Sequence, residues 1–221
     1  MTAGDKIFPA TVMPDRDWWA ALWPNPEATL RALGIKPGMT VLDLCCGDGW
    51  FTAPLALLTD GRVYALDLDP TMLDRAKDEV ARAGATVAGW IAGDARELPA
   101  LLPEKVDFVL IANTFHGVPD QTALSKAVAA ILKPGGLFAV VNWHARPREE
   151  TPILGQPRGP RTEMRMMPEA TRAVVEPAGF VLDRVVELPP YHYGAVFRHL
   201  RPQISPSRGL SFLSNSKNDV G

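Results

Sequence analysis

Apolar and polar positions follow two alternating patterns along most of the chain. Short runs rich in apolar and β-branched residues are typical of buried strands, and they occur at residues 40–44, 61–68, 86–92, 106–112, 137–143, 180–188 and 195–200. Between them, apolar residues recur at helical spacing, which predicts helices at residues 26–34, 50–58, 70–83, 120–132 and 168–176. Strands that alternate with helices imply an α/β fold with a Rossmann-like, doubly wound sheet of seven mostly parallel strands.

The last strand is expected to run antiparallel to its neighbour. Residues 189–194 (PPYHYG) are all that connects the last two predicted strands. A parallel crossover needs about a dozen residues or more. We therefore expect these two strands to form a hairpin, with PPYHYG as its loop.

The organisation we expect is a single domain over residues 1–203, followed by a flexible tail. Residues 204–221 are rich in serine, glycine and asparagine and lack periodicity, which is typical of a flexible segment. Residues 15–33 begin with a tryptophan-rich stretch. We interpret residues 15–33 as a helical lid over a substrate site, with ordinary packing of this helix on the sheet as the alternative.

Composition excludes several classes of function. The 221 residues carry a formal net charge of −2, so we expect no nucleic-acid partner. No apolar run reaches the roughly 20 residues that span a bilayer, and residues 1–10 lack the pattern of a signal peptide. The only two cysteines are adjacent, which fits a reducing, cytoplasmic location. We therefore expect a small-molecule substrate. Whether the protein forms a homodimer stays open.

The turn after the first predicted strand reads Gly47-Asp48-Gly49, and two ligands compete for it. A dinucleotide site needs a third glycine three residues on, but Thr52 stands there. Asp48 would also bring a carboxylate close to a pyrophosphate. A nicotinamide-dependent oxidoreductase is therefore disfavoured.

A positively charged nucleoside fits the turn better, because carboxylates end the strands around it. Asp43 ends the first strand beside Asp48, and Asp67 ends the second. A carboxylate at Asp67 can accept both ribose hydroxyls. Asp94, after the third strand, can accept from an exocyclic amine, and Met72 offers an apolar face to a purine.

Five segments together closely resemble the class I S-adenosylmethionine-dependent methyltransferases of the small-molecule, UbiE-like or type 11 kind. They are VLDLCCGDG, VYALDLDPTML, AGDARELP, VDFVLIANTFHGV and LKPGGLFAVVNWH, in family order and at family spacing over roughly residues 30–200. The resemblance implies a seven-stranded sheet with its last strand antiparallel and S-adenosyl-L-methionine as cofactor, with S-adenosyl-L-homocysteine as product.

The resemblance also assigns the cofactor's contacts. It implies that Asp43 and Gly47 border the methionine part, with Asn113 nearby, that Asp67 holds the ribose, and that Asp94 and Ala95 border the adenine. We expect the whole cofactor site to comprise Asp43, Cys45, Gly47, Asp48, Gly49, Asp67, Leu68, Met72, Gly93, Asp94, Ala95 and Asn113. Cys45 departs from the family, which usually has glycine there.

The expected activity is methyl transfer to a small organic acceptor, whose attacking atom (O, N, S or C) stays open. The alternatives are a catalytically silent S-adenosylmethionine-binding module and a protein methyltransferase. Methyl transfer requires in-line placement of the nucleophile, and a general base only if that nucleophile carries a proton.

His116 and His144 follow the fourth and fifth strands, and we predict them as catalytic bases; each could instead hydrogen-bond to backbone. No acidic cluster accompanies them, so no metal site is expected. Residues predicted to contact substrate, against the alternative of core packing, are Trp18, Trp19, Trp143, Tyr191, His192 and Tyr193. We interpret Cys45 and Cys46 as small residues in a tight turn rather than as a thiolate centre.

Residues 145–167 form a loop that should lie over the active site. The loop carries five arginines and three glutamates. Arginine forks suit carboxylates and phosphates, so an acidic substrate is one interpretation. The interpretation we favour from sequence is a solvated surface loop with internal ion pairs.

Overall fold

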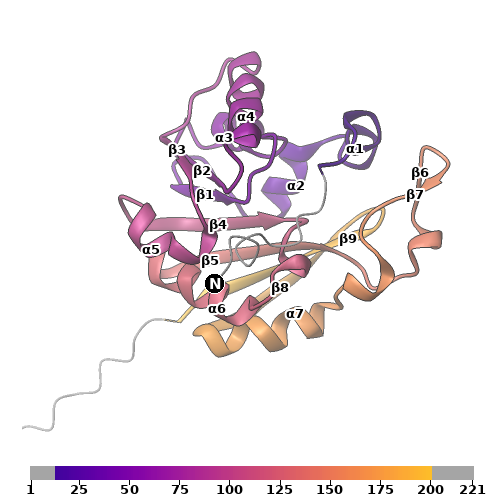
Figure 1. Ribbon diagram of the computed structural model, residues 1–221. Coiled ribbons are helices and arrows are strands. Elements are labelled where there is room, and N and C mark those ends of the chain that lie inside the picture. The colour runs from indigo at the N-terminus through magenta and orange to yellow at the C-terminus, as the bar shows by residue number, and fades with distance from the viewer. Residues whose placement is uncertain (1–12, 201–221) are drawn as a thin grey trace, which may run out of the picture.

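The computed structural model describes residues 13–200, so the predicted tail at residues 204–221 lies outside the described residues. A seven-stranded sheet forms the centre, with the strand order β3-β2-β1-β4-β5-β9-β8 (Figure 1). The first five of these strands are parallel, and β9 is antiparallel to both of its neighbours. The strands are β1 (Val41–Leu44), β2 (Val63–Asp67), β3 (Gly89–Ala92), β4 (Val106–Ala112), β5 (Leu132–Trp143), β8 (Phe180–Leu188) and β9 (His192–His199). The predicted fold class and hairpin are confirmed.

Helices cover both faces of the sheet. In Figure 1, α3 and α4 lie above the sheet, whereas α6 and α7 lie below it. The helices are α1 (Arg16–Leu22), α2 (Pro26–Ala32), α3 (Thr52–Leu58), α4 (Pro70–Arg82), α5 (Leu98–Leu101), α6 (Gln121–Ile131) and α7 (Pro168–Val175). Alternate residues of each central strand enter opposite cores: Val41 packs with α1, α2 and α3, and Leu42 packs with α5 and α6. None of the helices described between residues 13 and 200 has the length and apolar character needed to cross a bilayer.

Aspartate side chains cap the N-termini of two helices. Asp69 and Asp120 accept hydrogen bonds from the backbone N–H groups of Thr71 and Ala123, which caps α4 and α6. A side-chain oxygen at this position satisfies one of the free donors of a helix N-terminus. Pro70 then occupies the first helical position, where no intrahelical donor is needed.

The predicted hairpin loop at residues 189–194 is wrong at its second half. Strand β9 already begins at His192, which pairs with Trp143 of β5 and Leu188 of β8. Gly194 serves close packing rather than a turn, because a Cβ there would lie 2.3 Å from Cδ2 of Leu33. His192 and Tyr193 are therefore buried strand residues.

The long segment between β5 and α7 has structure of its own. It contains a small hairpin of β6 (Pro152–Ile153) and β7 (Gln156–Pro157). Figure 1 shows this hairpin extending on the same side as α1, and Ile153 packs with the tryptophans of α1. The predicted surface loop is thus an ordered wall beside the N-terminal helix.

Candidate active site

A cavity of about 900 Å³ opens at the carboxyl ends of β1 and β4. These two strands flank the point where the strand order reverses, which is where ligands of doubly wound sheets bind. Its walls come from the segment before α1, from α1, from the turn after β1, from the end of β4 and from the β5–α7 segment. The lining residues are Met13, Pro14, Trp18, Trp19, Asp43, Cys45, Cys46, Gly47, Asp48, Trp50, Phe51, Ala112, Asn113, Thr114, His116, Trp143, Arg148, Arg158, Gly159, Pro160, Arg161, Glu163 and Met164.

The turn after β1 brings backbone to the cavity wall. Gly47 and Gly49 adopt φ angles of 55° and 86°, which glycine tolerates without steric cost. A Cβ at Gly49 would lie 2.7 Å from Cα of Ala76 in α4, so glycine also permits this close approach. Cys45 holds a φ of 60°, the left-handed conformation that costs a residue with a Cβ roughly 1–2 kcal/mol.

Asp43 is a buried carboxylate at the cavity. It is 2% exposed, and its Oδ2 accepts a hydrogen bond of 2.6 Å from the Thr52 hydroxyl. No Lys or Arg between residues 13 and 200 lies within ion-pair distance of it. Burial raises the pKa of Asp43 to about 7, and the nearby Asp67 adds to this rise. Burial also raises the pKa of Asp48 above its ordinary value. A cationic ligand would stabilise both carboxylates.

The predicted ribose and adenine residues lie along the same sheet edge but outside the cavity lining. The carboxylate of Asp67 accepts hydrogen bonds from the backbone N–H of Gly47 at 2.9 Å and of Asp69 at 3.0 Å. Asp94 caps the short helix η2 (Ala95–Glu97) and pairs with Arg96. The other predicted cofactor residues outside the lining are Gly49, Leu68, Met72, Gly93 and Ala95.

Asn113 presents an amide to the cavity from the end of β4. Its backbone φ is 60°. Its Oδ1 accepts a hydrogen bond of 2.8 Å from Nε2 of His192. Its buried Nδ2 has no partner among the described residues. The ring of His192 lies between Trp23 and Trp143, with centroid separations of 4.5 and 4.3 Å.

The two predicted catalytic histidines lie in different places relative to the cavity. His116, in η3 (Phe115–Gly117), lines the cavity, and burial lowers its pKa below the ordinary 6.5. His144 lies outside the lining, where Nε2 is 3.0 Å from Oε2 of Glu187 and the ring packs on Tyr193. The geometry thus brings only His116 to the cavity.

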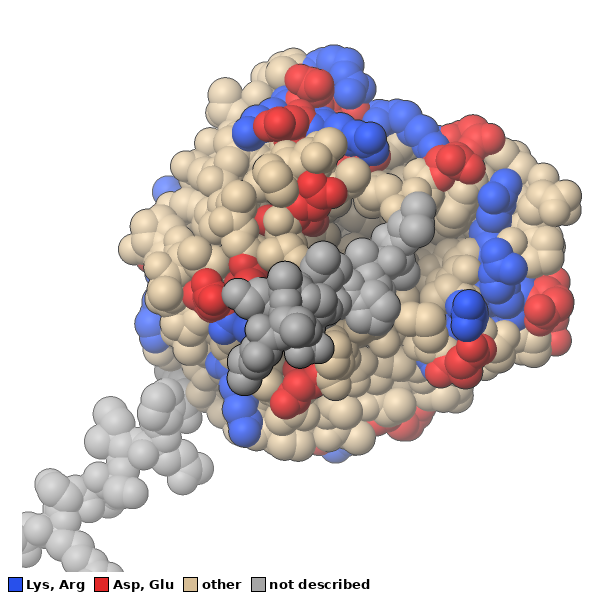
Figure 2. All heavy atoms as spheres, viewed as in Figure 1, with Lys and Arg blue, Asp and Glu red and all other residues tan. Residues whose placement is uncertain are grey.

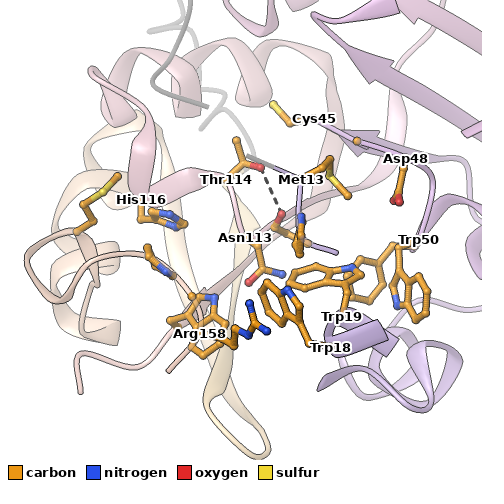
Figure 3. Close-up of a pocket in the computed structure, with 18 of the residues that line it drawn as sticks. Met13, Trp18, Trp19, Cys45, Asp48, Trp50, Asn113, Thr114, His116 and Arg158 are labelled. Atoms are coloured by element: carbon orange, nitrogen blue, oxygen red, sulfur yellow. Dashed lines mark hydrogen bonds between the residues drawn. The ribbon is translucent and has the colours of Figure 1, made fainter. Parts of the chain in front are cut away.

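Trp18, Trp19 and Trp143 form a second wall of the cavity. Trp18 and Trp19 come from α1, and Trp143 ends β5. Trp50 directly follows the glycine turn and lies beside Asp48. Trp18 and Trp19 pack edge to face, with their centroids 5.6 Å apart. Figure 3 shows their rings beside Asn113. This wall offers flat apolar surfaces to a ligand.

The other predicted aromatic contacts lie outside the lining. Tyr193 is fully buried, and its hydroxyl hydrogen-bonds to Oγ1 of Thr171 at 2.7 Å. Tyr191 stacks on Trp143 and donates a hydrogen bond to the backbone oxygen of Pro152. Tyr191 thereby supports Trp143 and the β6–β7 hairpin.

The prediction of ion pairs within the 145–167 loop is wrong for its arginines. In the part of the chain that the structure describes, none of them lies within ion-pair distance of a carboxylate. Arg148, Arg158 and Arg161 line the cavity instead. Arg165 is buried and donates to the backbone oxygens of Arg146, Arg158 and Pro160 and to Oγ1 of Thr151.

The cysteines behave as small packing residues. Both thiols are free, and burial raises the pKa of Cys45 and of Cys46 far above the ordinary value. A protonated thiol is a poor nucleophile. The geometry therefore gives no support to a thiolate centre.

Sequence reasoning missed two parts of the cavity. Met13 and Pro14 reach it from the segment before α1, and Trp50 and Phe51 from the start of α3. Trp50 and Phe51 directly follow the glycine turn, and this position in the sequence could have indicated that they line the cavity. Nothing in the local pattern around Met13 indicates that its Sδ would lie against Gly47, 2.9 Å from a Cβ placed there.

Comparison with known proteins shows that part of this chain is similar to methyltransferases. Residues 41–136 match the family described as "Methyltransferase domain". The demethylmenaquinone methyltransferase of Bacillus mycoides is 36% identical over 112 residues, which are 50% of this chain and 47% of that protein. An uncharacterized methyltransferase of Synechocystis sp. is 39% identical over 120 residues, 53% of each chain. The chain thus spans about half the length of the curated relatives it matches.

Solved structures extend the likeness over most of the chain. An S-adenosylmethionine-dependent methyltransferase from Aquifex aeolicus aligns with a TM-score of 0.69 and 25% identity, covering 84% of this chain and 94% of that one. A magnesium protoporphyrin IX methyltransferase from Synechocystis, solved with bound S-adenosylmethionine, aligns with a TM-score of 0.62 and 16% identity over 90% and 92% of the two chains. The second likeness concerns the fold alone.

Proposed function

We propose that this chain, which belongs to the class I S-adenosylmethionine-dependent methyltransferases, transfers the cofactor's methyl group to a small organic acceptor. The observation that carries the proposal is a single cavity with two unlike walls. Asp43, Asp48 and the glycine turn form one wall, and tryptophans form the other. One wall suits a cationic nucleoside, and the other suits an organic acceptor beside it.

The first wall fits S-adenosylmethionine chemically. This cofactor carries a sulfonium, an ammonium and a carboxylate. The buried carboxylate of Asp43 has no cationic partner in the described chain, and the Nδ2 donor of Asn113 has no acceptor there. A ligand with both charges satisfies both groups. Asp67 would hold the ribose beside Gly47, and Asp94 and Ala95 would border the adenine. When bound, the cofactor supplies an activated methyl group.

The protein's own contribution is placement. Holding the acceptor in line with the methyl group can supply roughly 7–11 kcal/mol of the barrier. The tryptophan wall orients the acceptor and excludes water from the reacting atoms. If the acceptor's nucleophile carries a proton, His116 is the base that lines the cavity, and its lowered pKa keeps the ring neutral and able to accept that proton near pH 7.

The test has two steps, because a silent binding module and an enzyme differ only in the second. Calorimetry should show binding of S-adenosylhomocysteine to the wild-type chain and at least tenfold weaker binding to Asp43→Asn. A panel of small acceptors and unmodified protein substrates should then be scored by S-adenosylhomocysteine release. Release with small acceptors alone supports the proposal. Absence of cofactor binding contradicts it, and release only with proteins favours a protein methyltransferase.

A further inference from the structure

We infer that the methyl acceptor is an aromatic or otherwise flat molecule that carries an oxyanion, a carboxylate or a phosphate, and that Arg158 and Arg161 hold this group. The inference rests on the proposed function and names the class of acceptor. It depends on the charge of the cavity wall formed by the β5–α7 segment.

The two ends of the cavity differ in charge. Asp43 and Asp48 lie at the end formed by the turn after β1, whereas Arg148, Arg158 and Arg161 lie at the other. Figure 3 shows Arg158 next to Trp18 at one end of the view, with Cys45 and Asp48 at the other. In Figure 2, Lys and Arg atoms gather along the side of the molecule where the β6–β7 hairpin lies. An anion is attracted to the arginine end and repelled from the end proposed for the cofactor.

These arginines have no carboxylate to neutralise them. No Asp or Glu between residues 13 and 200 lies within 4.0 Å of the guanidinium groups of Arg148, Arg158 or Arg161. Glu163 is the single acid on this wall. Three cations against one anion leave an excess positive charge at the edge of an aromatic cavity.

Arg158 has an unsatisfied donor. Its Nε is enclosed, yet it has no hydrogen-bond partner in the described part of the chain. A buried donor without an acceptor costs roughly 1–3 kcal/mol, so an acceptor from a ligand would recover that cost. A guanidinium presents its N–H groups as a rigid fork that matches the two oxygens of a carboxylate or phosphate.

The position of Arg158 is fixed by the structure around it. Its guanidinium lies 5.3 Å from the ring centroid of Trp18, a cation–π contact. Its backbone oxygen accepts hydrogen bonds from Oγ1 of Thr151 and Nη2 of Arg165. Arg148 in turn donates from Nε to the backbone oxygen of Gly159. Arg158 is therefore held in place before any ligand arrives.

The same wall determines the shape of the acceptor. Trp18 and Trp143 line the cavity together with Arg158. Arg165, which is on the same loop as Arg158, lies 4.9 Å from the ring centroid of Trp143. The Trp143 ring is itself covered by Tyr191 and Arg165 and is 2% exposed. A flat molecule can therefore pack against the accessible part of Trp18 while its acidic group reaches the arginines. A neutral apolar acceptor would fill the aromatic surface but leave the arginines unpaired.

The test measures binding rather than turnover, on the full chain saturated with S-adenosylhomocysteine. The probes are matched pairs of one- and two-ring aromatic acids and their uncharged amides, for example 4-hydroxycinnamate and 4-hydroxycinnamamide, with aryl phosphates as a third set. We expect at least one acid or phosphate to bind tenfold or more tightly than its neutral partner. Raising the salt concentration from 0.05 to 0.5 M should reduce this preference, because salt screens the ion pair.

Variants locate the site. Arg158→Gln and Arg161→Gln should each reduce the preference to less than threefold, and Arg158→Lys should keep part of it because the charge remains without the fork. Arg172→Gln, on the exposed side of α7 and paired with Glu176, is the matched control and should change nothing. If no acid or phosphate in the panel outbinds its neutral partner while S-adenosylhomocysteine still binds, the inference is overturned and the proposed function stands. If S-adenosylhomocysteine itself fails to bind, the proposed function is rejected.

Discussion

Nε2 of His192 donates a hydrogen bond to Oδ1 of Asn113 over 2.8 Å, between two side chains that are both buried. The carboxamide oxygen cannot donate, so Nε2 carries a proton. Burial also lowers the pKa of His192 well below its ordinary value. With Oδ1 engaged, Nδ2 of Asn113 is left buried and without a partner among the described residues. A strand residue outside the cavity lining thus holds the amide of a residue that lines it.

Replacing His192 should separate packing from orientation. His192→Phe keeps an aromatic ring between Trp23 and Trp143 but removes the donor, so the free energy of unfolding should fall by about 1–3 kcal/mol. We also expect S-adenosylhomocysteine to bind roughly five- to tenfold more weakly, because the Asn113 amide is no longer held. His192→Gln keeps a donor and should recover part of the affinity. Denaturant unfolding and calorimetry measure the two effects. Equal affinity in both variants and the wild type would mean that His192 only packs.

Asp43 should make both stability and cofactor affinity depend on pH. Its pKa rises from the ordinary 3.8 to about 7 on folding. A raised folded pKa contributes stability that is present below about pH 4 and is lost as the pH rises through 7. Each pKa unit corresponds to about 1.4 kcal/mol, so wild type should lose roughly 2–4 kcal/mol of stability relative to Asp43→Asn over this window. Denaturation at pH 5 and at pH 8 measures it, and parallel curves for the two proteins would count against an elevated pKa.

Cofactor affinity should follow the opposite course. S-adenosylhomocysteine has lost the sulfonium charge but keeps the ammonium group. If this ammonium pairs with the ionised Asp43, the affinity should rise as the pH increases from 5 to 7 and then level off. Binding at pH 5 should release no proton from Asp43→Asn, whereas wild type should release one. Calorimetry in buffers of different ionisation enthalpy measures this proton. A pH-independent affinity in wild type would remove Asp43 from the cofactor's charge recognition.

The fold was predictable because its signals are local. Asp69 and Asp120 cap helices through hydrogen bonds to residues two or three positions on, and such contacts follow from sequence spacing alone. Gly194 shows the limit. A glycine in a short connection between two predicted strands is typical of a turn, yet here it makes room for Leu33, which is far away in sequence.

The site was predictable only where a strand end determines it. Asp43 follows from its place near the end of β1, and Gly47 and Asn113 from their places after β1 and β4. The arginine wall does not, because the interactions of Arg158 depend on which groups the folded loop brings near it. The backbone carbonyls that Arg165 binds come from residues 146–160, and a carbonyl carries no sequence signal. Arginines that satisfy backbone and arginines that face a ligand therefore look alike before folding.

Asp67→Ala should weaken binding of S-adenosylhomocysteine by at least tenfold. The expected cause is loss of the acceptor for the ribose hydroxyls, together with loss of the hydrogen bond from the Gly47 N–H. Asp67→Asn can still accept from that N–H, so it should preserve the turn while weakening ribose recognition. Comparing S-adenosylhomocysteine with its 2′-deoxy analogue by calorimetry distinguishes the two contributions. If wild type binds both ligands equally, Asp67 does not recognise the ribose.

His116→Ala should lower turnover more than it lowers cofactor affinity, because His116 lines the cavity beyond the cofactor wall. If it acts as a base, the wild-type kcat should fall as the pH drops below the lowered pKa of His116, and the variant should lose this pH dependence. His199→Ala, at the far end of β9, is the matched control. His144→Ala, whose ring lies outside the lining, should leave the pH profile unchanged. Wild-type rates for His116→Ala would remove histidine from the mechanism.

Arg165 should control the acceptor wall without touching the cofactor wall. Its guanidinium is buried and donates to three backbone oxygens and to the hydroxyl of Thr151. Arg165→Met removes these bonds and leaves the backbone oxygens of Arg146 and Pro160 without this donor. Each unpaired buried group costs roughly 1–3 kcal/mol, and we expect the 145–167 loop to open before the sheet unfolds. Hydrogen exchange in this loop should therefore accelerate at least tenfold, and binding of acidic aromatic ligands should weaken. Affinity for S-adenosylhomocysteine should stay within threefold of wild type, because the turn after β1 is untouched.

The matched control is Arg146→Gln. Arg146 is an exposed arginine of the same loop whose side chain makes no hydrogen bond within residues 13–200, so this variant should show the same hydrogen exchange as wild type. Equal weakening of both ligands by Arg165→Met would show that the two walls of the cavity are one cooperative unit.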